Sequence, residues 1–581
     1  MSADRKIRRL LAVLSLCALA TSGGCTPWRD YFANGFKVGP EYRRPAAAVA
    51  KDWIDTSDLV SSRSPEEIRT WWRILGDPTL DGLVANAYQQ NLTLREAGFR
   101  VLQARAARAI AAGYLFPQQQ DIAGDYQRIA ISSAAANSQF LPERFYDQWD
   151  LGFNLAWELD FWGRFRRALE AADADLDASV ENYDQVLVTL IGDVAATYVE
   201  VRTLQQQILL VKTNVGLQRE TYNIANARFR GGQVSSLDVD QAVSNLAQTE
   251  ALVPQLGIRL RQASNRLCIL LGMPPEELLR RLGDGPIPTA PPEIAVGVPA
   301  DLLTQRPDVR RAERLVAGQC AVVGVAISEL YPHIGVSGTL GYSSQNLTDL
   351  MTSQALQSSV GPYFQWNVLH YGRMLNEIRR QDAKLAELIV AYQNTVLKAN
   401  AEAEDGLAKY LGAQQATRFL AVSVDASKKA TDVALVQYRA GLVDFNRVSL
   451  IEQNLVDQQN QLAESQGSIA QGLVQVYRSL GGGWQIRLNG QQGGAPQAVP
   501  TPAGPRPETV PAPTPVPAPA PVPAPRPQLD PNNILPKRLD PEPAPGPVLS
   551  PMAARSPADA KRPASASASP YSYWPDAQRF R

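Results

Sequence analysis

The chain has 581 residues, with 57 lysines and arginines against 57 aspartates and glutamates, so its formal net charge is zero. Without a net basic charge it lacks the field that attracts nucleic acid, and we expect no nucleic-acid partner. Two histidines, His333 and His370, and four scattered cysteines provide neither a His-based triad nor metal-ligand spacing, so we expect no metal and no cofactor.

The N-terminus has the pattern of an export signal. Basic residues precede an apolar run, residues 10–20, that is too short to cross a bilayer. The string Ser22-Gly23-Gly24-Cys25 follows and resembles the site at which bacterial lipoproteins are cleaved and acylated, although Ser22 stands where leucine is usual. We expect a signal peptide over residues 1–24 and lipid attachment at Cys25. The alternative is cleavage nearby with an unmodified thiol.

An internal repeat organises the middle of the chain. Trp162-Gly163-Arg164 returns as Tyr371-Gly372-Arg373, and at the same spacing Phe229-Arg230-Gly231-Gly232 returns as Tyr438-Arg439-Ala440-Gly441. One spacing for turns, aromatic residues and helix ends predicts two structural repeats, residues 81–272 and 301–490. Each repeat should contain a helix, two strands joined by a polar loop and a long helical hairpin.

The strand pair of the first repeat is expected within residues 118–161. From Trp149 to Phe161, apolar and largely aromatic residues alternate with polar or small ones. This period predicts a strand with one apolar and one polar face, about as long as a tilted membrane strand. A strand half-buried in a soluble sandwich would alternate in the same way, so the pattern alone leaves both readings open.

The strand pair of the second repeat is expected within residues 332–370. Its first strand alternates from Ile334 to Tyr342, and Phe364, Trp366 and Val368 are assigned to its second strand. The polar loops that join the strands of the two pairs are residues 132–145 and 343–359.

Long helices are expected after each strand pair. Residues 145–253 and 363–484 contain no proline, and an interior proline costs a helix about 3 kcal/mol. Apolar residues three and four apart in 186–215 form one helical packing face. A helix over residues 164–230 would be about 100 Å long.

Both hairpins have recognisable turns, at residues 230–236 and 439–445. Gly232 and Gly441 suit left-handed helix ends, and Ser235 and Asp444 suit the N-caps of the helices that follow. Cys268 and Cys320 lie among apolar helical neighbours and are expected to be buried rather than disulfide-bonded.

Several strings show a resemblance to a known family. Four strands cannot close a membrane barrel alone, because bacterial barrels have at least eight, so the subunit must associate. The chain is similar to the TolC-like outer-membrane efflux factors, especially their NodT-type lipoprotein branch, from about residue 25 to 490. The strings that carry the resemblance are Phe36-Lys37-Val38-Gly39-Pro40-Glu41-Tyr42-Arg43-Arg44-Pro45, Trp71-Trp72-Arg73-Ile74-Leu75-Gly76-Asp77-Pro78-Thr79-Leu80, Asn91-Leu92-Thr93-Leu94, Gln305-Arg306-Pro307-Asp308-Val309-Arg310-Arg311-Ala312-Glu313 and Tyr477-Arg478-Ser479-Leu480-Gly481-Gly482-Gly483-Trp484.

The resemblance implies an α+β fold of mostly long α-helical hairpins. In a homotrimer these would form a periplasmic helical barrel below a 12-stranded transmembrane β-barrel, with four strands per subunit. Residues 25–80 would be a lipid-anchored N-terminal extension in contact with outer-membrane lipid, and residues 273–300 an equatorial linker.

The implied function is an outer-membrane duct in a tripartite efflux system. A periplasmic adaptor and an inner-membrane transporter, of the RND type in this branch, would deliver drugs, metal ions or other small solutes into it. No nucleotide-binding string and no converging nucleophile, base or metal set occurs, so we expect no enzyme activity. The outer-membrane duct of a type I protein secretion system is the alternative.

The hairpin turns are the candidate site. In the family they form the periplasmic aperture and meet the adaptor. The alternative is that in this chain they only cap helices. The expected adaptor-contact residues are Arg230, Gly232, Ser235, Arg439, Gly441 and Asp444. The candidate aperture residues are Asp238, Asp240, Arg447, Leu450 and Glu452, the charged ones being surface charges in the alternative reading.

Residues 491–581 lie outside the resemblance. They are rich in proline and alanine, which favours an extended, solvated chain, and we expect a disordered tail. The family places this end in the periplasm, where the tail would contact peptidoglycan or the adaptor or act as a passive spacer.

Overall fold

The computed structural model describes residues 28–54, 68–134, 136, 140, 143–291, 294 and 299–489, all in the unit Met1–Val499. The expected signal peptide, Cys25 and the tail from residue 491 lie outside the described residues. In chain order the elements are α2 (Trp28–Ala33), η2 (Trp71–Leu75), α4 (Pro78–Gln90), α5 (Leu92–Gly113), β1 (Gln119–Ala130), β2 (Phe145–Leu159), α6 (Arg164–Arg230), α7 (Ser236–Leu270), α8 (Leu278–Leu282), η4 (Pro299–Asp301), α9 (Leu302–Gln305), α10 (Pro307–Ser328), β3 (His333–Ser344), η5 (Leu347–Asp349), β4 (Leu356–Gln365), α11 (Arg373–Arg439), α12 (Phe445–Ser479) and α13 (Ile486–Asn489).

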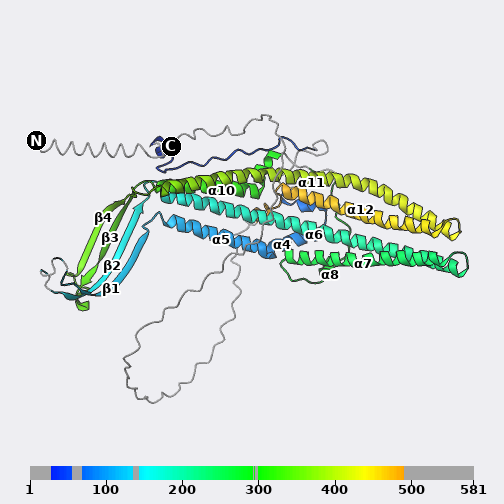
Figure 1. Cartoon of the computed structure of the whole chain (residues 1–581), viewed down its shortest axis with the longest axis horizontal. Helices are drawn as coiled ribbons and strands as arrows, with labels where there is room; N and C mark the ends of the chain where they lie inside the picture. Colours follow the sequence, from blue (N-terminus) through cyan, green and yellow to red (C-terminus); the bar gives the residue numbers. More distant parts are fainter. Residues whose placement is uncertain are drawn as a thin grey trace, which may run out of the picture. The chain divides into compact units, whose positions relative to one another are not determined.

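Two long helical hairpins account for most of the described chain. Helices α6 and α11 have 67 residues each, and α7 and α12 have 35 each. At 1.5 Å per residue, α6 and α11 are about 100 Å long. The predicted bounds of α6, residues 164–230, are confirmed. The two hairpins pack against each other through α6 and α12 (Figure 1).

Helix α7 extends beyond residue 253, where the proline-free stretch that predicted it ends. It passes through Pro254 and ends at Leu270. The lost hydrogen bond at Pro254 is offset because the helix packs against α6 on both sides of it. Ala242 lies in an apolar cluster with Ala225 of α6, and Ala263 packs with Val201 and Leu204 further along α6.

The four strands form one antiparallel sheet in the order β1-β2-β3-β4. The two predicted strand pairs are present, and β2 joins them by pairing with β3, for example Leu155 with Gly338. The sheet lies at one end of the long helices, and the hairpin turns lie at the other (Figure 1).

Strands β2 and β4 end earlier than predicted. Strand β4 ends at Gln365, so Trp366 and Val368 lie beyond it, and β2 ends at Leu159, before Phe161. The reason is that β3 begins at His333, directly after Pro332, and offers no further partner. The predicted loop 343–359 is correspondingly shorter, because β3 continues to Ser344 and β4 begins at Leu356.

The main apolar core lies midway along the helices, where η2, α4 and α10 pack against α6, α11 and α12. Trp71 and Tyr477 are fully buried there, with their rings stacked 5.5 Å apart. Cys268 and Cys320 are buried and free, as predicted. Among the helices of the described residues, none is both long and apolar enough to cross a membrane.

Candidate functional site

The two faces of the sheet differ in chemistry. Ile122, Phe153 and Leu340 lie opposite one another across β1, β2 and β3, and all three side chains are exposed. On the other face, Asp121, Asn154 and Thr339 form the neighbouring row, and Asn154 Nδ2 donates to Asp121 Oδ2 at 3.0 Å. An exposed apolar face of this kind is stable only against apolar surroundings, whereas the opposite face suits water.

A charged cluster joins the sheet to the helices. Glu158 of β2 lies 2.7 Å from His333 Nδ1 and 3.2 Å from an Arg164 guanidinium nitrogen. Arg164 also pairs with Glu329 at 3.0 Å. These contacts link the ends of both strand pairs to α6 and α10, so they fix the sheet relative to the helices.

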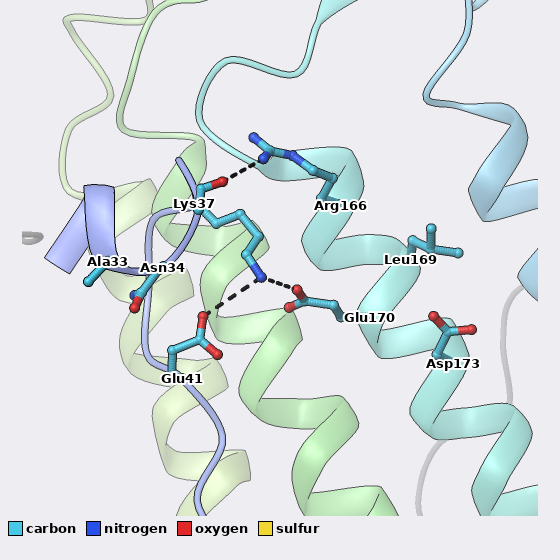
Figure 2. A pocket seen from close by; sticks show the side chains of 9 residues that line it. Ala33, Asn34, Lys37, Glu41, Arg166, Leu169, Glu170 and Asp173 are labelled. Carbon is cyan, nitrogen blue, oxygen red and sulfur yellow. Dashed lines mark hydrogen bonds and ion pairs between the residues drawn. The ribbon is translucent and has the colours of Figure 1, made fainter.

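A second charged group lies between the N-terminal segment, residues 28–41, and the start of α6. It lines an open cleft of about 650 Å³ (Figure 2). Lys37 Nζ pairs with Glu170 and lies 3.8 Å from Glu41 (Figure 2). Arg166 donates to the Gly35 carbonyl at 2.7 Å. Because these charges are paired with one another, the cluster attaches the N-terminal segment to α6 and offers no catalytic set.

The hairpin turns use the same backbone geometry. Gly232 and Gly441 have φ of 70° and 75° and occupy the left-handed region that favours glycine. In each turn the next residue's N–H bonds back into the helix: Gln233 to the Arg228 carbonyl and Leu442 to the Gln437 carbonyl, both at 2.9 Å. These are the bonds of a Schellman helix end.

The caps of the outgoing helices differ. Asp444 accepts a hydrogen bond from the Arg447 N–H at 2.9 Å and caps α12 as predicted. Ser235 occupies the N-cap position of α7 but makes no side-chain capping bond. The predicted N-cap position of Ser235 is therefore confirmed, although its side chain provides no capping hydrogen bond.

Side-chain contacts join the two hairpins near these turns. Arg228 of α6 donates to the Tyr438 carbonyl at 2.6 Å, and its guanidinium lies 4.7 Å from the Tyr438 ring centroid. The Tyr438 hydroxyl donates to Asp238 at 3.3 Å, and Arg439 pairs with Glu220. The first hairpin is therefore held to the second by polar contacts through α6 and α7.

Most of the sequence-predicted tip residues lie on the surface of these turns. Arg230, Gly232, Ser235, Arg439, Gly441 and Asp444 are exposed, and so are Asp240, Arg447 and Leu450. Asp238 is half-buried and accepts the hydrogen bond from the Tyr438 hydroxyl.

Glu452 is the exception among the candidate aperture residues. It is 2% exposed between α6 and α12, and its carboxylate accepts a 2.6 Å hydrogen bond from Thr221. Burial raises the pKa of Glu452 to about 7, partly opposed by the Thr221 hydrogen bond. The structure thus places Glu452 inside the subunit and not with the exposed aperture candidates.

Sequence reasoning missed the functions of Arg228, Tyr438 and Thr221. Tyr438 was noted only as a repeat match, and Arg228 precedes the motif by one residue. A signal for Glu452 was available, because it falls four residues from both Val448 and Val456, on the buried face of α12.

Comparisons with known proteins agree with this geometry. Residues 83–273 and 298–482 match the family model described as outer membrane efflux protein. The pyoverdine export outer membrane protein OpmQ of Pseudomonas putida is 31% identical over 427 residues, covering 71% of this chain and 88% of that protein. Nodulation protein T of Rhizobium leguminosarum bv. trifolii is 26% identical, covering 78% of this chain and 94% of that protein.

Solved structures share the fold. The outer-membrane channel OprN superposes with a TM-score of 0.72 at 32% identity, covering 77% of this chain and 99% of that one. The Campylobacter jejuni CmeC outer membrane channel has a TM-score of 0.72 at 21% identity, covering 79% and 98%.

Proposed function

The chain belongs to the outer membrane efflux protein family, and on this basis we propose that it forms, as a homotrimer, the outer-membrane duct of a tripartite efflux system. It is an outer-membrane efflux protein with a periplasmic helical extension. The trimer, its partners and its aperture residues are the parts that we propose.

The two-faced sheet at one end of the long helices carries the proposal. Four strands leave β1 and β4 with free edges, which lipid does not tolerate, so a membrane sheet of this kind must close with other copies. Three copies would give a 12-stranded barrel with rows such as Ile122–Phe153–Leu340 facing lipid and rows such as Asp121–Asn154–Thr339 facing water. The four long helices of each subunit would continue the wall as a periplasmic tunnel.

The turns at residues 231–235 and 440–444 would be the periplasmic end of the duct. We propose that Arg230, Gly232, Ser235, Arg439, Gly441 and Asp444 contact a periplasmic adaptor, because these residues are exposed at the tips of both hairpins. Asp238, Asp240, Arg447 and Leu450 would surround the aperture. We leave Glu452 out of that ring because it is buried.

The transported solute would come from an inner-membrane transporter of the RND type. Relatives are named for pyoverdine export and for toluene and solvent efflux, and small solutes of this kind are our proposal for this chain. Acylation at Cys25 would anchor the N-terminus in the same membrane, and the tail from residue 491 would extend into the periplasm, where it would reach peptidoglycan. The duct itself would perform no chemistry.

Reconstitution tests the proposal directly. The full chain, extracted in mild detergent, should have the mass of a trimer by light scattering and give stepwise conductance in planar bilayers. Two exposed residues of the sheet provide a matched pair. Phe153→Asp places a charge on the apolar face and should reduce insertion, whereas Thr339→Asp on the polar face should insert normally and increase cation preference. A monomer without conductance, or equal insertion of both variants, would contradict the proposed barrel.

A further inference from the structure

Two strained aromatic residues lie where the sheet meets the helices. Among the described residues, the non-glycine residues with positive φ are Phe36 (62°) and Tyr371 (49°). Their side chains are 53% and 90% exposed. A left-handed backbone is strained for a non-glycine residue, and such strain concentrates at functional sites. The surrounding contacts therefore keep the aromatic rings of Phe36 and Tyr371 exposed at the surface of the subunit.

The contacts that hold Phe36 are numerous. Arg166 donates to the carbonyls of Gly35 at 2.7 Å and Phe36 at 2.8 Å. The Phe36 N–H donates to the Tyr31 carbonyl at 2.9 Å, and the Tyr31 hydroxyl donates to the Phe161 carbonyl at 2.7 Å. Residues 31–36 are thereby fixed to the end of β2 and the start of α6.

A second exposed ring accompanies Phe36. Phe32 is 57% exposed, and its ring meets the Phe36 ring edge to face at 5.4 Å. Tyr31, directly before Phe32 in sequence, is buried against Trp162, which in turn stacks on Tyr331 before β3. The exposed pair therefore lies beside the junction where both strand pairs meet the helices.

Further exposed aromatic residues occur at the same junction. They are Phe116, Phe161 and Tyr371. Aromatic side chains gather at the headgroup level of membranes, where apolar rings leave water without leaving the interface. A group of exposed rings just below a membrane sheet fits that level better than it fits water.

We propose that Phe32 and Phe36 insert into the interfacial region of the outer membrane's inner leaflet, so that the N-terminal segment binds the phospholipid surface directly. This inference rests on the proposed function, because it needs the sheet to cross the membrane. The pair lies shortly after Cys25 in sequence and would hold the segment at the lipid surface whether or not that cysteine is acylated.

Depth-dependent quenching tests the inference on the full chain. Phe32→Cys and Phe36→Cys are made in a Cys25→Ser background, labelled with an environment-sensitive thiol probe and reconstituted in phosphatidylcholine vesicles containing shallow or deep doxyl-labelled lipid. Cysteine carries a Cβ as phenylalanine does, so the backbone strain is unchanged. Cys268 and Cys320 are buried, and the unsubstituted background measures their labelling. Ile122→Cys on the apolar sheet face and Leu442→Cys at a hairpin turn are reference positions, since both side chains are exposed.

We expect shallow quencher to remove most of the emission at positions 32 and 36, deep quencher to act mainly at position 122, and neither to act at 442. Water-like, unquenched probes at 32 and 36 with a quenched probe at 122 would overturn the inference and leave the proposed duct intact. Blue-shifted but unquenched probes would mean that another protein surface covers the pair, which also overturns it. Absence of quenching at 122 would refute the membrane sheet and the inference together.

Discussion

The Thr221 hydroxyl donates a 2.6 Å hydrogen bond to the carboxylate of Glu452, and both side chains are at least 98% buried between the two hairpins. One turn earlier on α6, the buried Gln218 has no side-chain hydrogen-bond partner. An acidic group enclosed in this way is costly to ionise, so its protonation state is coupled to the packing of α6 on α12.

We expect the stability of the subunit to fall as pH rises from about 4.5 to about 7. Burial raises the pKa of Glu452 from 4.5 to about 7. Within that window the unfolded chain has lost this proton and the folded chain still holds it, so deprotonation opposes folding. Glu452→Gln should remove the contribution of Glu452 to this dependence, with a gain above pH 7 of about 3 kcal/mol at most, while Glu181, whose pKa burial also raises to about 7, keeps its own contribution. Thermal unfolding of both proteins across pH 4 to 8 measures it.

The exposed Glu464 on the same helix provides the control for Glu452. Glu464→Gln should leave the pH profile of wild type unchanged. Parallel profiles for wild type and Glu452→Gln would show that the carboxyl ionises freely and that its burial has no energetic consequence.

Tyr438 of the second hairpin bonds Asp238 of the first near the turns, so loosening this contact should let the hairpins separate there and raise the open probability of the proposed aperture. Tyr438→Phe removes the hydroxyl that bonds Asp238 but keeps the buried ring against Phe445. A hydrogen bond of this kind contributes about 0.5–1.5 kcal/mol, which limits the change in open probability to about tenfold. Planar-bilayer conductance measures it. Tyr410→Phe removes a hydroxyl from the same helix away from the tip and should leave conductance unchanged. Equal conductance in wild type and Tyr438→Phe would show that the Tyr438–Asp238 hydrogen bond does not hold the aperture closed.

Local signals predicted the elements of the fold well. Helix α6 begins and ends where predicted, because Gly163 and Gly231 flank a stretch without proline. The alternation in β2 predicted its two faces. Both signals depend only on neighbours in the chain, so a single sequence carries them.

Contacts between distant segments could not be predicted in this way. The pairing of β2 with β3 depends on a register, Leu155 opposite Gly338, that no local pattern specifies. The contact of Arg228 with the Tyr438 carbonyl joins segments far apart in sequence. The burial of Glu452 could have been found from its spacing, but the side chain that bonds it is on another helix.

Adding a methyl group at two glycines of the first hairpin should have opposite effects. Gly232 has a φ of 70°, so Gly232→Ala strains the turn and should destabilise the hairpin by about 1–2 kcal/mol. Gly216 lies within α6, and a Cβ there meets no atom within 4 Å. Gly216→Ala should therefore stabilise the subunit by up to about 1 kcal/mol. Thermal unfolding of both variants measures the effects. If the midpoints of Gly232→Ala and Gly216→Ala shifted in the same direction, the left-handed backbone at Gly232 and the helical backbone at Gly216 would not explain their stability.

Arg306 is a buried charge whose contacts join three helices, so we expect its replacement to lower stability. It donates to Asp308 at 3.0 and 2.6 Å, to Glu402 at 2.8 Å and to the Ser479 carbonyl at 2.8 Å, and so ties α10 to α11 and to the end of α12. Arg306→Ala would leave the buried Ser479 carbonyl without this donor, whereas water can solvate the exposed Glu402 carboxylate and Asp308 keeps the Val309 N–H, so the loss should be about 1–3 kcal/mol.

Two further variants separate the geometry at Arg306 from its charge. Arg306→Lys keeps the charge but cannot reach Asp308 and Ser479 together, so its loss of stability should be intermediate. Arg311→Ala removes an exposed arginine from the same helix and should change stability by less than about 0.5 kcal/mol. Denaturant unfolding in detergent measures all three. If Arg306→Lys matched wild type, charge alone would be sufficient and the planar guanidinium would have no special function at this position.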